Sequence, residues 1–251
     1  MKVLVLKKTA VVIILVVLIF LSALCVNNTG LSVGAVFVNK KIPIYSVDAQ
    51  ESKLSISFDA AWGADKTRDI MSVCNNYGVK ATFFLVGFWV EKYPEMVKEI
   101  YNNGFEIGLH SNTHPDMTKL SKSEIKQELE TNIKLIENII GTKPKLFRPP
   151  FGYYNNNLLD VCEELNIYCI QWDIDSLDWK GLSANAIAGR VIKNAKNGSI
   201  ILCHNNSDHI VDALSMIFEY FKLSNKKLVP IGNLIYHNNY RIDNFGKQIK
   251  V

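Results

Sequence analysis

Glycine, proline and cysteine are all sparse in this 251-residue chain, which contains 14, 7 and 5 of them, respectively. Collagen-like and low-complexity chains need far more glycine and proline, so both classes are excluded. The five cysteines are scattered and form no C-x-x-C pair, which argues against a disulfide framework and against a cysteine zinc site. We therefore expect most of them to be small buried apolar residues.

A strong excess of charge of either sign is also lacking. The chain has 28 basic and 24 acidic residues, a net charge of +4, and 48% of its residues are hydrophobic. Intrinsic disorder needs a lower hydrophobic content and a higher net charge, so the composition predicts a folded chain. Basic residues form no block longer than a pair such as Lys226-Lys227, so we expect no nucleic-acid binding.

One long apolar run is present at residues 9–26, which carry no charged side chain. Its length lies between the core of a signal peptide and a membrane-spanning helix, so it predicts export of the residues that follow. Lys2, Lys7 and Lys8 precede the run, and the positive-inside rule places residues 1–8 in the cytoplasm. No small-x-small cleavage site closes the run, which favours a retained single-pass anchor in the cell membrane over cleavage and secretion.

Beyond residue 50, short apolar runs alternate with longer stretches of helical periodicity. The apolar runs predict seven strands, at residues 54–58, 81–86, 105–109, 145–148, 167–172, 199–203 and 228–231. The periodic stretches predict helices near residues 66–77, 94–102, 121–139, 155–165, 183–195 and 209–222. Ser121 and Glu124 form a capping-box pattern at the start of the longest helix, and Gly141 follows its end.

This alternation predicts an α/β fold with parallel strands and right-handed crossovers, which is either a doubly wound sheet or a barrel. Seven near-equal units without a G-x-G-x-x-G motif favour a distorted (β/α) barrel with about seven parallel strands over residues 51–251. Residues 27–50 contain Pro43 and a short apolar alternation. They indicate a stalk or a covering strand rather than a second domain.

Ionisable side chains follow five of the seven predicted strands. In parallel α/β folds the loops at the carboxyl ends of the strands converge on one face and form the active site. Random placement would scatter such residues among helix faces and both rims, so their position predicts a catalytic cleft. The residues concerned are Asp59, His110, His114, Arg148, Asp173, Asp175, Asp178 and His204.

Several of these residues have two interpretations. His110 and His114 have the spacing that brings two imidazoles to one side of a turn, as a divalent metal requires, or they are surface or capping histidines. Arg148 precedes two prolines, which suit an arginine that orients a carboxylate, or it is a solvated rim residue. His204 follows an apolar run and is either a core histidine or a general acid.

The segment WDIDSLDW, residues 172–179, places three carboxylates between two tryptophans. One interpretation is helix capping combined with surface charge. The other is a wall that stacks against sugars and includes a carboxylate that tunes a histidine. On the second interpretation, Asp175 and Trp179 belong to the substrate-binding surface.

Five short segments together resemble, in order and spacing, the motifs of the polysaccharide deacetylase family, the NodB-homology enzymes of carbohydrate esterase family 4. They are SFD (57–59), HSNTHP (110–115), RPPFG (148–152), DSLDW (175–179) and LCH (202–204). The resemblance covers about residues 51–232 and implies a distorted (β/α) barrel that removes acetyl groups from N-acetylated amino sugars. The sequence FDAAWG (58–63), which follows a short N-terminal apolar segment, resembles that of the PdaB-like sporulation branch of the family.

The resemblance also implies a role for each matching residue. The roles are catalytic base for Asp59, orientation of that base for Arg148, catalytic acid for His204, tuning of the acid for Asp178, metal ligands for His110 and His114, an oxyanion donor for the backbone N–H of Phe151, and a pocket residue for Leu202. The implied cofactor is a divalent metal, Zn²⁺ or Co²⁺. In this chemistry Asp59 takes a proton from the attacking water and His204 protonates the departing amine.

The chain departs from the family pattern at Ala60, where the second of two aspartates usually binds the metal. A methyl group cannot coordinate, and two neutral imidazoles without an anionic ligand bind a metal more weakly. Asp59 itself, Asp65 in the following loop, or water would have to replace the missing ligand. Otherwise the metal has been lost and the domain only binds glycan.

The leading hypothesis is therefore a membrane-anchored N-deacetylase of cell-wall or spore-wall glycan, such as peptidoglycan, with its domain outside the cell. A catalytically silent glycan-binding protein is the alternative, because of Ala60. A hydrolase that acts on another amide is a third reading, since fold does not set substrate. The expected partners are the wall glycan and the membrane, and the sequence does not indicate an oligomeric state.

Overall fold

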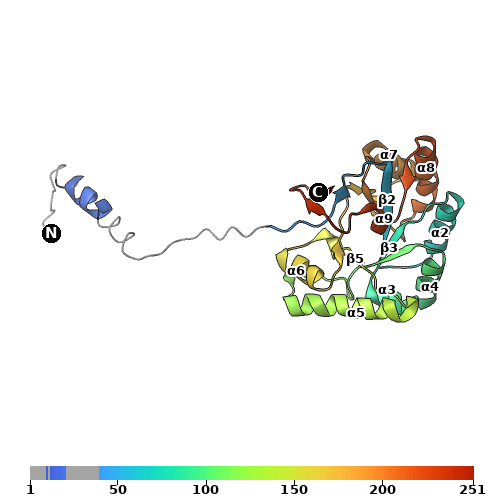
Figure 1. Cartoon of the computed structure of the whole chain (residues 1–251), viewed down its shortest axis with the longest axis horizontal. Helices are drawn as coiled ribbons and strands as arrows, with labels where there is room; N and C mark the ends of the chain where they lie inside the picture. Colours follow the sequence, from blue (N-terminus) through green and yellow to red (C-terminus); the bar gives the residue numbers. More distant parts are fainter. Residues whose placement is uncertain (1–9, 11, 21–39) are drawn as a thin grey trace, which may run out of the picture. The chain divides into compact units, whose positions relative to one another are not determined.

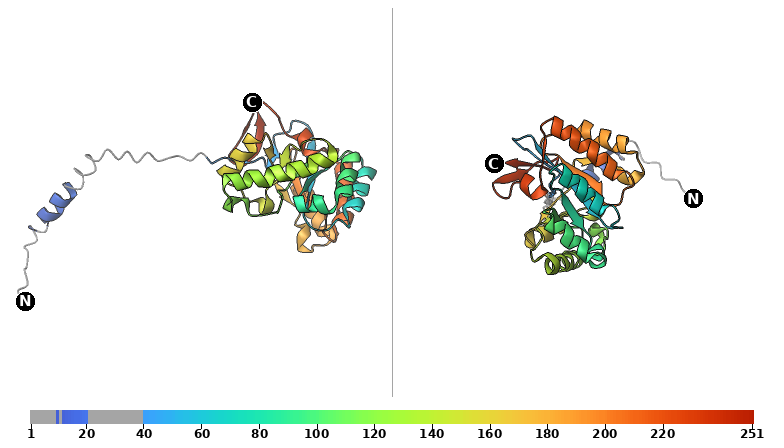
Figure 2. Two further views of the ribbon diagram at one scale, coloured as in Figure 1. Left: turned by 90° about the horizontal axis from the view of Figure 1, so that it is seen from below. Right: turned by 90° about the vertical axis from the view of Figure 1, so that its right-hand side faces the viewer.

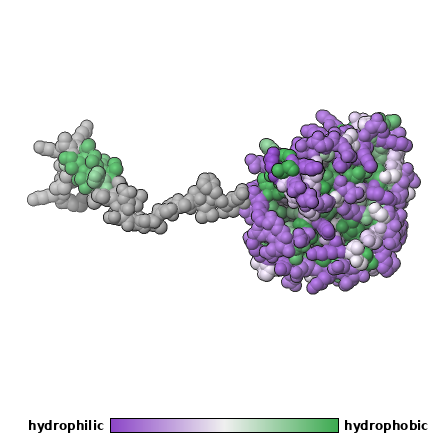
Figure 3. Space-filling view, viewed as in Figure 1, coloured by the Kyte–Doolittle hydropathy of each residue, from purple (hydrophilic) through white to green (hydrophobic). Residues whose placement is uncertain are grey.

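A computed structural model describes residues 10, 12–20 and 40–251, and the chain divides into two compact units, Met1–Asn39 and Lys40–Val251. In the first unit, residues 12–20 are helical and their apolar side chains are exposed (Figure 3). None of the helices within the described residues is both long enough and apolar enough to cross a membrane. Residues 1–8, residues 9, 11 and 21–26 of the predicted anchor, and residues 27–39 of the predicted stalk lie outside the described residues.

Parallel strands form the centre of the second unit. They are β2 (Lys53–Ala60), β3 (Thr82–Leu85), β4 (Glu106–Leu109), β5 (Leu146–Phe147), β6 (Tyr168–Cys169), β7 (Ile174–Asp175), β8 (Ile200–His204) and β9 (Lys227–Leu228). Their order in the sheet is β6-β5-β4-β3-β2-β8-β7, and β9 pairs separately with β2. Every one of these pairings is parallel, which confirms the predicted α/β sheet of about seven parallel strands.

Helices connect these strands and cover the sheet (Figure 1). They are α2 (Thr67–Asn76), α3 (Gly87–Lys92), α4 (Pro94–Asn102), α5 (Lys122–Ile140), α6 (Asn156–Glu164), α7 (Ala184–Asn194), α8 (Ile210–Leu223) and α9 (Ile231–Leu234). In Figures 1 and 2, α7 and α8 lie on the opposite side of the unit from α5. The start and end of α5 are as predicted, because Ser121 and Glu124 form a capping box and Gly141 adopts the left-handed conformation that ends the helix.

The predicted strand at residues 228–231 is wrong in its second half. Only Lys227–Leu228 pairs with β2, and Pro230 then caps the short helix α9. A proline cannot donate to a strand ladder, which explains why the strand ends before it. The strand at the edge of the sheet beside β8 is instead β7, which was not predicted.

The second unit begins at Lys40, before the predicted boundary at residue 51. Ile44 forms a parallel bridge with Ile170, and Ser46 forms an antiparallel bridge with Ser199, so this segment lies across strands of the main sheet. A small second sheet has the order β1 (Ser46–Val47), β11 (Lys247–Lys250) and β10 (Tyr240–Ile242) (Figure 2). Residues 44–47 therefore pair with residues of both sheets.

Both faces of the main sheet are apolar. Phe83 packs in the large cluster formed with the surrounding helices, whereas its neighbour Phe84 packs in a second cluster with Ile44, Val47 and residues of α9. Successive strand residues point to opposite faces, so burial on both faces explains the continuous apolar runs in the sequence. Cys74, Cys162, Cys169 and Cys203 are buried and free, as predicted for small apolar residues.

Candidate active site

Four predicted site residues come together at the carboxyl ends of neighbouring strands. Asp59 and His204 are register partners near the ends of β2 and β8. His110 directly follows β4, and Arg148 directly follows β5. The parallel sheet therefore places these four side chains at one edge, as their positions after apolar runs predicted.

Arg148 and Asp59 form a buried ion pair. The Arg148 Nη1 atom donates to Asp59 Oδ1 at 2.8 Å, and the Arg148 side chain is 0% exposed. Burial raises the pKa of Asp59, but the positive charges around it, led by that of Arg148, outweigh this effect and lower the pKa below its ordinary value. Asp59 is thus an ionised carboxylate held in one orientation, and the interpretation of Arg148 as a solvated rim residue is wrong.

Two further residues hold Arg148, and sequence reasoning assigned neither of them a role. Ser57 Oγ accepts from Arg148 Nη1 at 2.8 Å and donates to the carbonyl of Ile201 at 2.8 Å. The backbone carbonyl of Gln171 accepts from Arg148 Nη2 at 3.2 Å. Ser57 precedes Asp59 by two positions on β2, so the period of a strand was the signal that could have identified it.

His204 and Asp178 form the second supported pair. The His204 Nδ1–H donates to Asp178 Oδ1 at 2.8 Å, and the His204 backbone N–H donates to Asp178 Oδ2 at 2.8 Å. Burial lowers the pKa of His204, but the hydrogen bond and charge of Asp178 outweigh it, so the pKa is raised above its ordinary value. The His204 side chain is 25% exposed, so His204 is partly open to solvent rather than enclosed in the core.

This pair predicts a pH-dependent contribution to stability. Because the folded-state pKa of His204 is raised, the stabilisation is fully present below the unfolded-state pKa of about 6.5 and is lost as pH rises through the folded-state pKa. We expect Asp178→Asn to lower the free energy of unfolding more at pH 6 than at pH 9. Urea denaturation at both pH values checks this, and an equal loss at both would contradict it.

His110 and His114 lie side by side, with ring centroids 5.0 Å apart. The His110 Nδ1–H donates to the carbonyl of Arg148 at 2.7 Å, and its Nε2 lies 3.6 Å from Asp59 Oδ2. Burial lowers the pKa of His110. Burial, and to a lesser extent the neighbouring His110, lowers the pKa of His114 to about 4. Both imidazoles are therefore neutral at pH 7.

The donors of the three-ligand metal site that the resemblance implies are not all present. Ala60 is fully buried and offers no ligand atom, and Asp65 is exposed. Within the part of the chain that the structure describes, no group of three or more His, Cys, Asp or Glu side chains is placed to hold a metal ion. The two histidines thus lack the carboxylate that the resemblance implies at position 60.

Exposed aromatic rings lie around His114 and next to Asp178 in the chain. Trp62, Phe151, Tyr153 and Trp179 are 55–59% exposed. The rings of Trp62 and Phe151 lie 5.1 Å and 4.7 Å from the ring of His114, and Tyr153 lies 5.8 Å from Phe151. These rings provide a surface on which a sugar can stack, and sequence reasoning missed Trp62 and Tyr153.

The other predicted site residues, Phe151, Leu202 and Asp175, lie in different structural environments. Phe151 adopts a left-handed backbone conformation, with φ 59° and ψ 3°, a strained geometry that is common at functional sites. Leu202 is buried within β8. The carboxylate of Asp175 accepts from the backbone N–H of Leu177 at 2.8 Å. Asp175 therefore stabilises the turn that carries Asp178, which corresponds to the capping interpretation of this segment.

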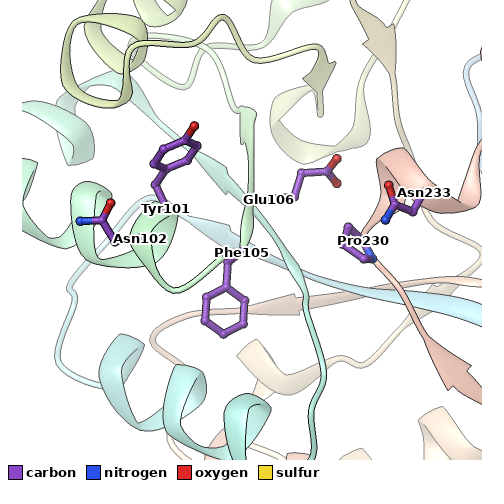
Figure 4. A pocket seen from close by; sticks show the side chains of 7 residues that line it. Tyr101, Asn102, Phe105, Glu106, Pro230 and Asn233 are labelled. Atoms are coloured by element: carbon purple, nitrogen blue, oxygen red, sulfur yellow. The ribbon is translucent and has the colours of Figure 1, made fainter.

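A pocket of about 600 Å³ lies away from these residues (Figure 4). Its lining residues include Glu106, at the first position of β4, and Pro230, before α9. Burial raises the pKa of Glu106, whose carboxylate accepts from Thr82 Oγ1 at 2.6 Å and from the backbone of Gly232. Glu106 thus joins α9 to the amino ends of the strands, whereas Asp59 and His204 lie at the carboxyl ends.

Comparison with known proteins identifies the family of this chain. Residues 46–170 match the polysaccharide deacetylase family, a span that includes Asp59, His110, His114 and Arg148. The chain is 32% identical over 209 residues to a peptidoglycan-N-acetylglucosamine deacetylase of Bacillus cereus, an alignment that covers 82% of this chain and 76% of the relative. The chain belongs to the polysaccharide deacetylase family.

Solved structures of the polysaccharide deacetylase family have the same fold as this chain. A pseudoenzyme of carbohydrate esterase family 4 from Bacillus anthracis superimposes with a TM-score of 0.74 at 30% identity, over 76% of this chain and 68% of that chain. A mutant of the same pseudoenzyme, described as having restored enzymatic activity, superimposes with a TM-score of 0.74 at 31% identity, over 76% of this chain and 70% of that chain. The family therefore includes both active and inactive proteins among the relatives of this chain.

Proposed function

We propose that this protein is a hydrolase that removes acetyl groups from N-acetylated amino sugars of a peptidoglycan-type glycan. The observation that carries the proposal is that adjacent strands carry two ionisable side chains, each fixed by a hydrogen-bonded partner. Asp59 is ionised and fixed by Arg148, and His204 is fixed by Asp178. A base and an acid therefore face the same space, as amide hydrolysis requires.

In this proposal water attacks the acetyl carbonyl and Asp59 accepts its proton. The raised pKa of His204 favours the protonated imidazole, and Nε2 delivers its proton to the amine as the carbon–nitrogen bond breaks. The products are acetate and a free amino sugar. In the same proposal the backbone N–H of Phe151, a residue in the left-handed conformation, stabilises the oxyanion, and the exposed aromatic rings hold the glycan.

A non-catalytic glycan-binding role is the second candidate, and Ala60 favours it. Without the usual carboxylate, the site retains the acid, the base and the aromatic surface but not the family's ligand set. The similarity to a pseudoenzyme of the same family supports this candidate as well.

Acetate release distinguishes the two candidates. The purified protein is incubated with peptidoglycan and with chito-oligosaccharides, with and without Zn²⁺ or Co²⁺, and its fold is checked by circular dichroism. Release of acetate supports the hydrolase. Binding to the glycan without release, by protein shown to be folded, would instead establish the binding role.

Replacing Ala60 by aspartate is expected to create a three-ligand site with His110 and His114. The variant should retain about one zinc ion per chain after dialysis, whereas the unmodified protein retains much less. Metal analysis by mass spectrometry checks this, and Ala61→Asp, which adds the same charge one residue later, is the matched control. Equal zinc content in the two variants would show that position 60 does not face the histidines.

We also propose that residues 9–26 hold the protein at the cell membrane with residues 40–251 on the outer side. The uncharged run and the lysines before it support this proposal. Cell fractionation combined with protease treatment of intact cells tests it. The proposal fails if the protein remains in the cytoplasmic fraction and is protected from the protease.

A further inference from the structure

The loop of residues 110–114 is held in an unusual backbone conformation. Ser111 and His114 have φ values of 64° and 60°, in the left-handed region that favours glycine. Neither residue is a glycine, and such conformations persist only where the surrounding structure determines them. The Ser111 side chain accepts from the His114 backbone N–H at 3.0 Å, but this bond lies within the loop itself. Contacts from other elements must therefore fix the loop to the rest of the fold.

Helix α3 contacts the loop through its backbone. The backbone N–H groups of Gly87 and Phe88 donate to the carbonyls of Ser111 and Asn112, at 3.0 Å and 3.2 Å. A Cβ atom on Gly87 would lie 2.9 Å from the Asn112 Cα and 2.1 Å from its Oδ1. Only glycine allows the helix to approach the loop so closely.

Helix α5 also contacts the loop, through one carboxylate. Glu128 Oε2 accepts from the backbone N–H groups of Asn112 and Thr113, both at 2.8 Å, and Glu128 Oε1 accepts from Thr113 Oγ1 at 2.7 Å. Hydrogen bonds to a charged acceptor are stronger than neutral ones. Glu128 thus satisfies the loop's donors while α3 satisfies its carbonyls.

We propose that Glu128 and Gly87 are positioning residues that set the place of His114 in the site. They touch no reacting group, and they act through the backbone of residues 111–113. The ring of His114 depends on this placement because it lies between Trp62 and Phe151 and against His110. The inference rests on the proposed function only in that His114 belongs to the proposed site.

Substitutions at Glu128 separate positioning from a merely structural role. Glu128→Leu removes all three acceptors, so exchange of the Asn112 and Thr113 amide protons should accelerate about 10- to 100-fold. Modification of His114 by diethyl pyrocarbonate should also change in rate, and acetate release should fall about 10- to 100-fold. Glu128→Gln should restore near-normal values, because its amide carbonyl still accepts from the backbone and its NH₂ group reaches the Thr113 hydroxyl.

Two further variants complete the test. Glu137 is an exposed residue of α5, so Glu137→Leu is the matched control and should leave all three readouts unchanged. Gly87→Ala should disturb His114 as Glu128→Leu does, by forcing the loop away from α3. If Glu128→Leu does not fold, Thr113→Val, which removes only the hydroxyl bond, is expected to give a smaller change in the same direction.

The outcomes distinguish this inference from the proposed function. If the unmodified protein releases no acetate but Glu128→Leu alone accelerates exchange at Asn112 and Thr113 and alters His114 modification, the positioning role stands and the deacetylase does not. If Glu128→Leu matches Glu137→Leu in amide exchange and in His114 modification, the positioning role is refuted, whatever the activity.

Discussion

Replacing His204 by alanine is expected to lower acetate release from an N-acetylated glycan by about 100- to 10,000-fold. His204 holds the proton that the leaving amine needs, and Asp178 keeps that proton on the imidazole by accepting from Nδ1 and by raising the pKa. Without the imidazole, the amine must leave unprotonated or take its proton from water. The measurement is the steady-state rate of acetate release at pH 7.

A matched control shows whether the loss comes from the acid itself. His209 is an exposed histidine before α8, and His209→Ala should retain nearly all the activity. The activity of Asp178→Asn should fall between those of His204→Ala and His209→Ala. As pH rises, it should also decline at a lower pH than the activity of the unmodified protein, because Asp178 no longer raises the pKa of His204. Activity of His204→Ala within a few-fold of His209→Ala would exclude His204 as the acid.

Most of the fold could be predicted because its elements are long and periodic. The helix Lys122–Ile140 has a capping box at one end and a left-handed glycine at the other, and both are visible in the sequence. The strands β3, β4 and β8 are buried on both faces and appear as short apolar runs, and in β2 the apolar residues alternate with the buried Ser55 and Ser57. The strands β7 and β10 are only two or three residues long and lie in no predicted apolar run, whereas the equally short β5 and β6 lie within the predicted runs 145–148 and 167–172.

The sequence predicted those residues of the candidate site that come at the end of a strand or directly after it. Asp59, His110, Arg148 and His204 were found because each comes at or directly after the end of an apolar run. Gln171 could not be found, since it binds Arg148 through a backbone carbonyl, a group that every residue has.

Tertiary packing explains the other residues that were missed. Glu128 lies in the middle of a helix, where a carboxylate ordinarily faces solvent, and only the packing of α5 against the loop brings it to Asn112 and Thr113. Gly87 begins α3, and its closeness to Asn112 follows from the same packing. The sequence pattern therefore located the site, while the supports of its loop needed the three-dimensional structure.

Replacing Arg148 by methionine is expected to cost about 3–5 kcal/mol of unfolding free energy at pH 7. The methionine fills similar apolar space, but it leaves the buried carboxylate of Asp59 without its cation and removes the donor bonded to Ser57. Arg68→Met is the control, because its ion pair with Glu99 is largely exposed and should be worth less than about 1 kcal/mol. Urea denaturation of both variants gives the comparison.

The pH dependence of this loss identifies its cause. In the unmodified protein the folded-state pKa of Asp59 is lowered, so its stabilisation is present above the unfolded-state pKa of about 3.9 and is lost as pH falls through the folded-state pKa. In Arg148→Met, burial dominates and raises that pKa, so the deficit should be largest at pH 7 and should shrink toward pH 4. Adding Asp59→Asn to Arg148→Met removes the unpaired charge and should recover part of the lost stability at pH 7. If the deficit does not depend on pH and the double variant recovers nothing, Arg148 stabilises the fold by packing against Phe84 rather than by holding the carboxylate.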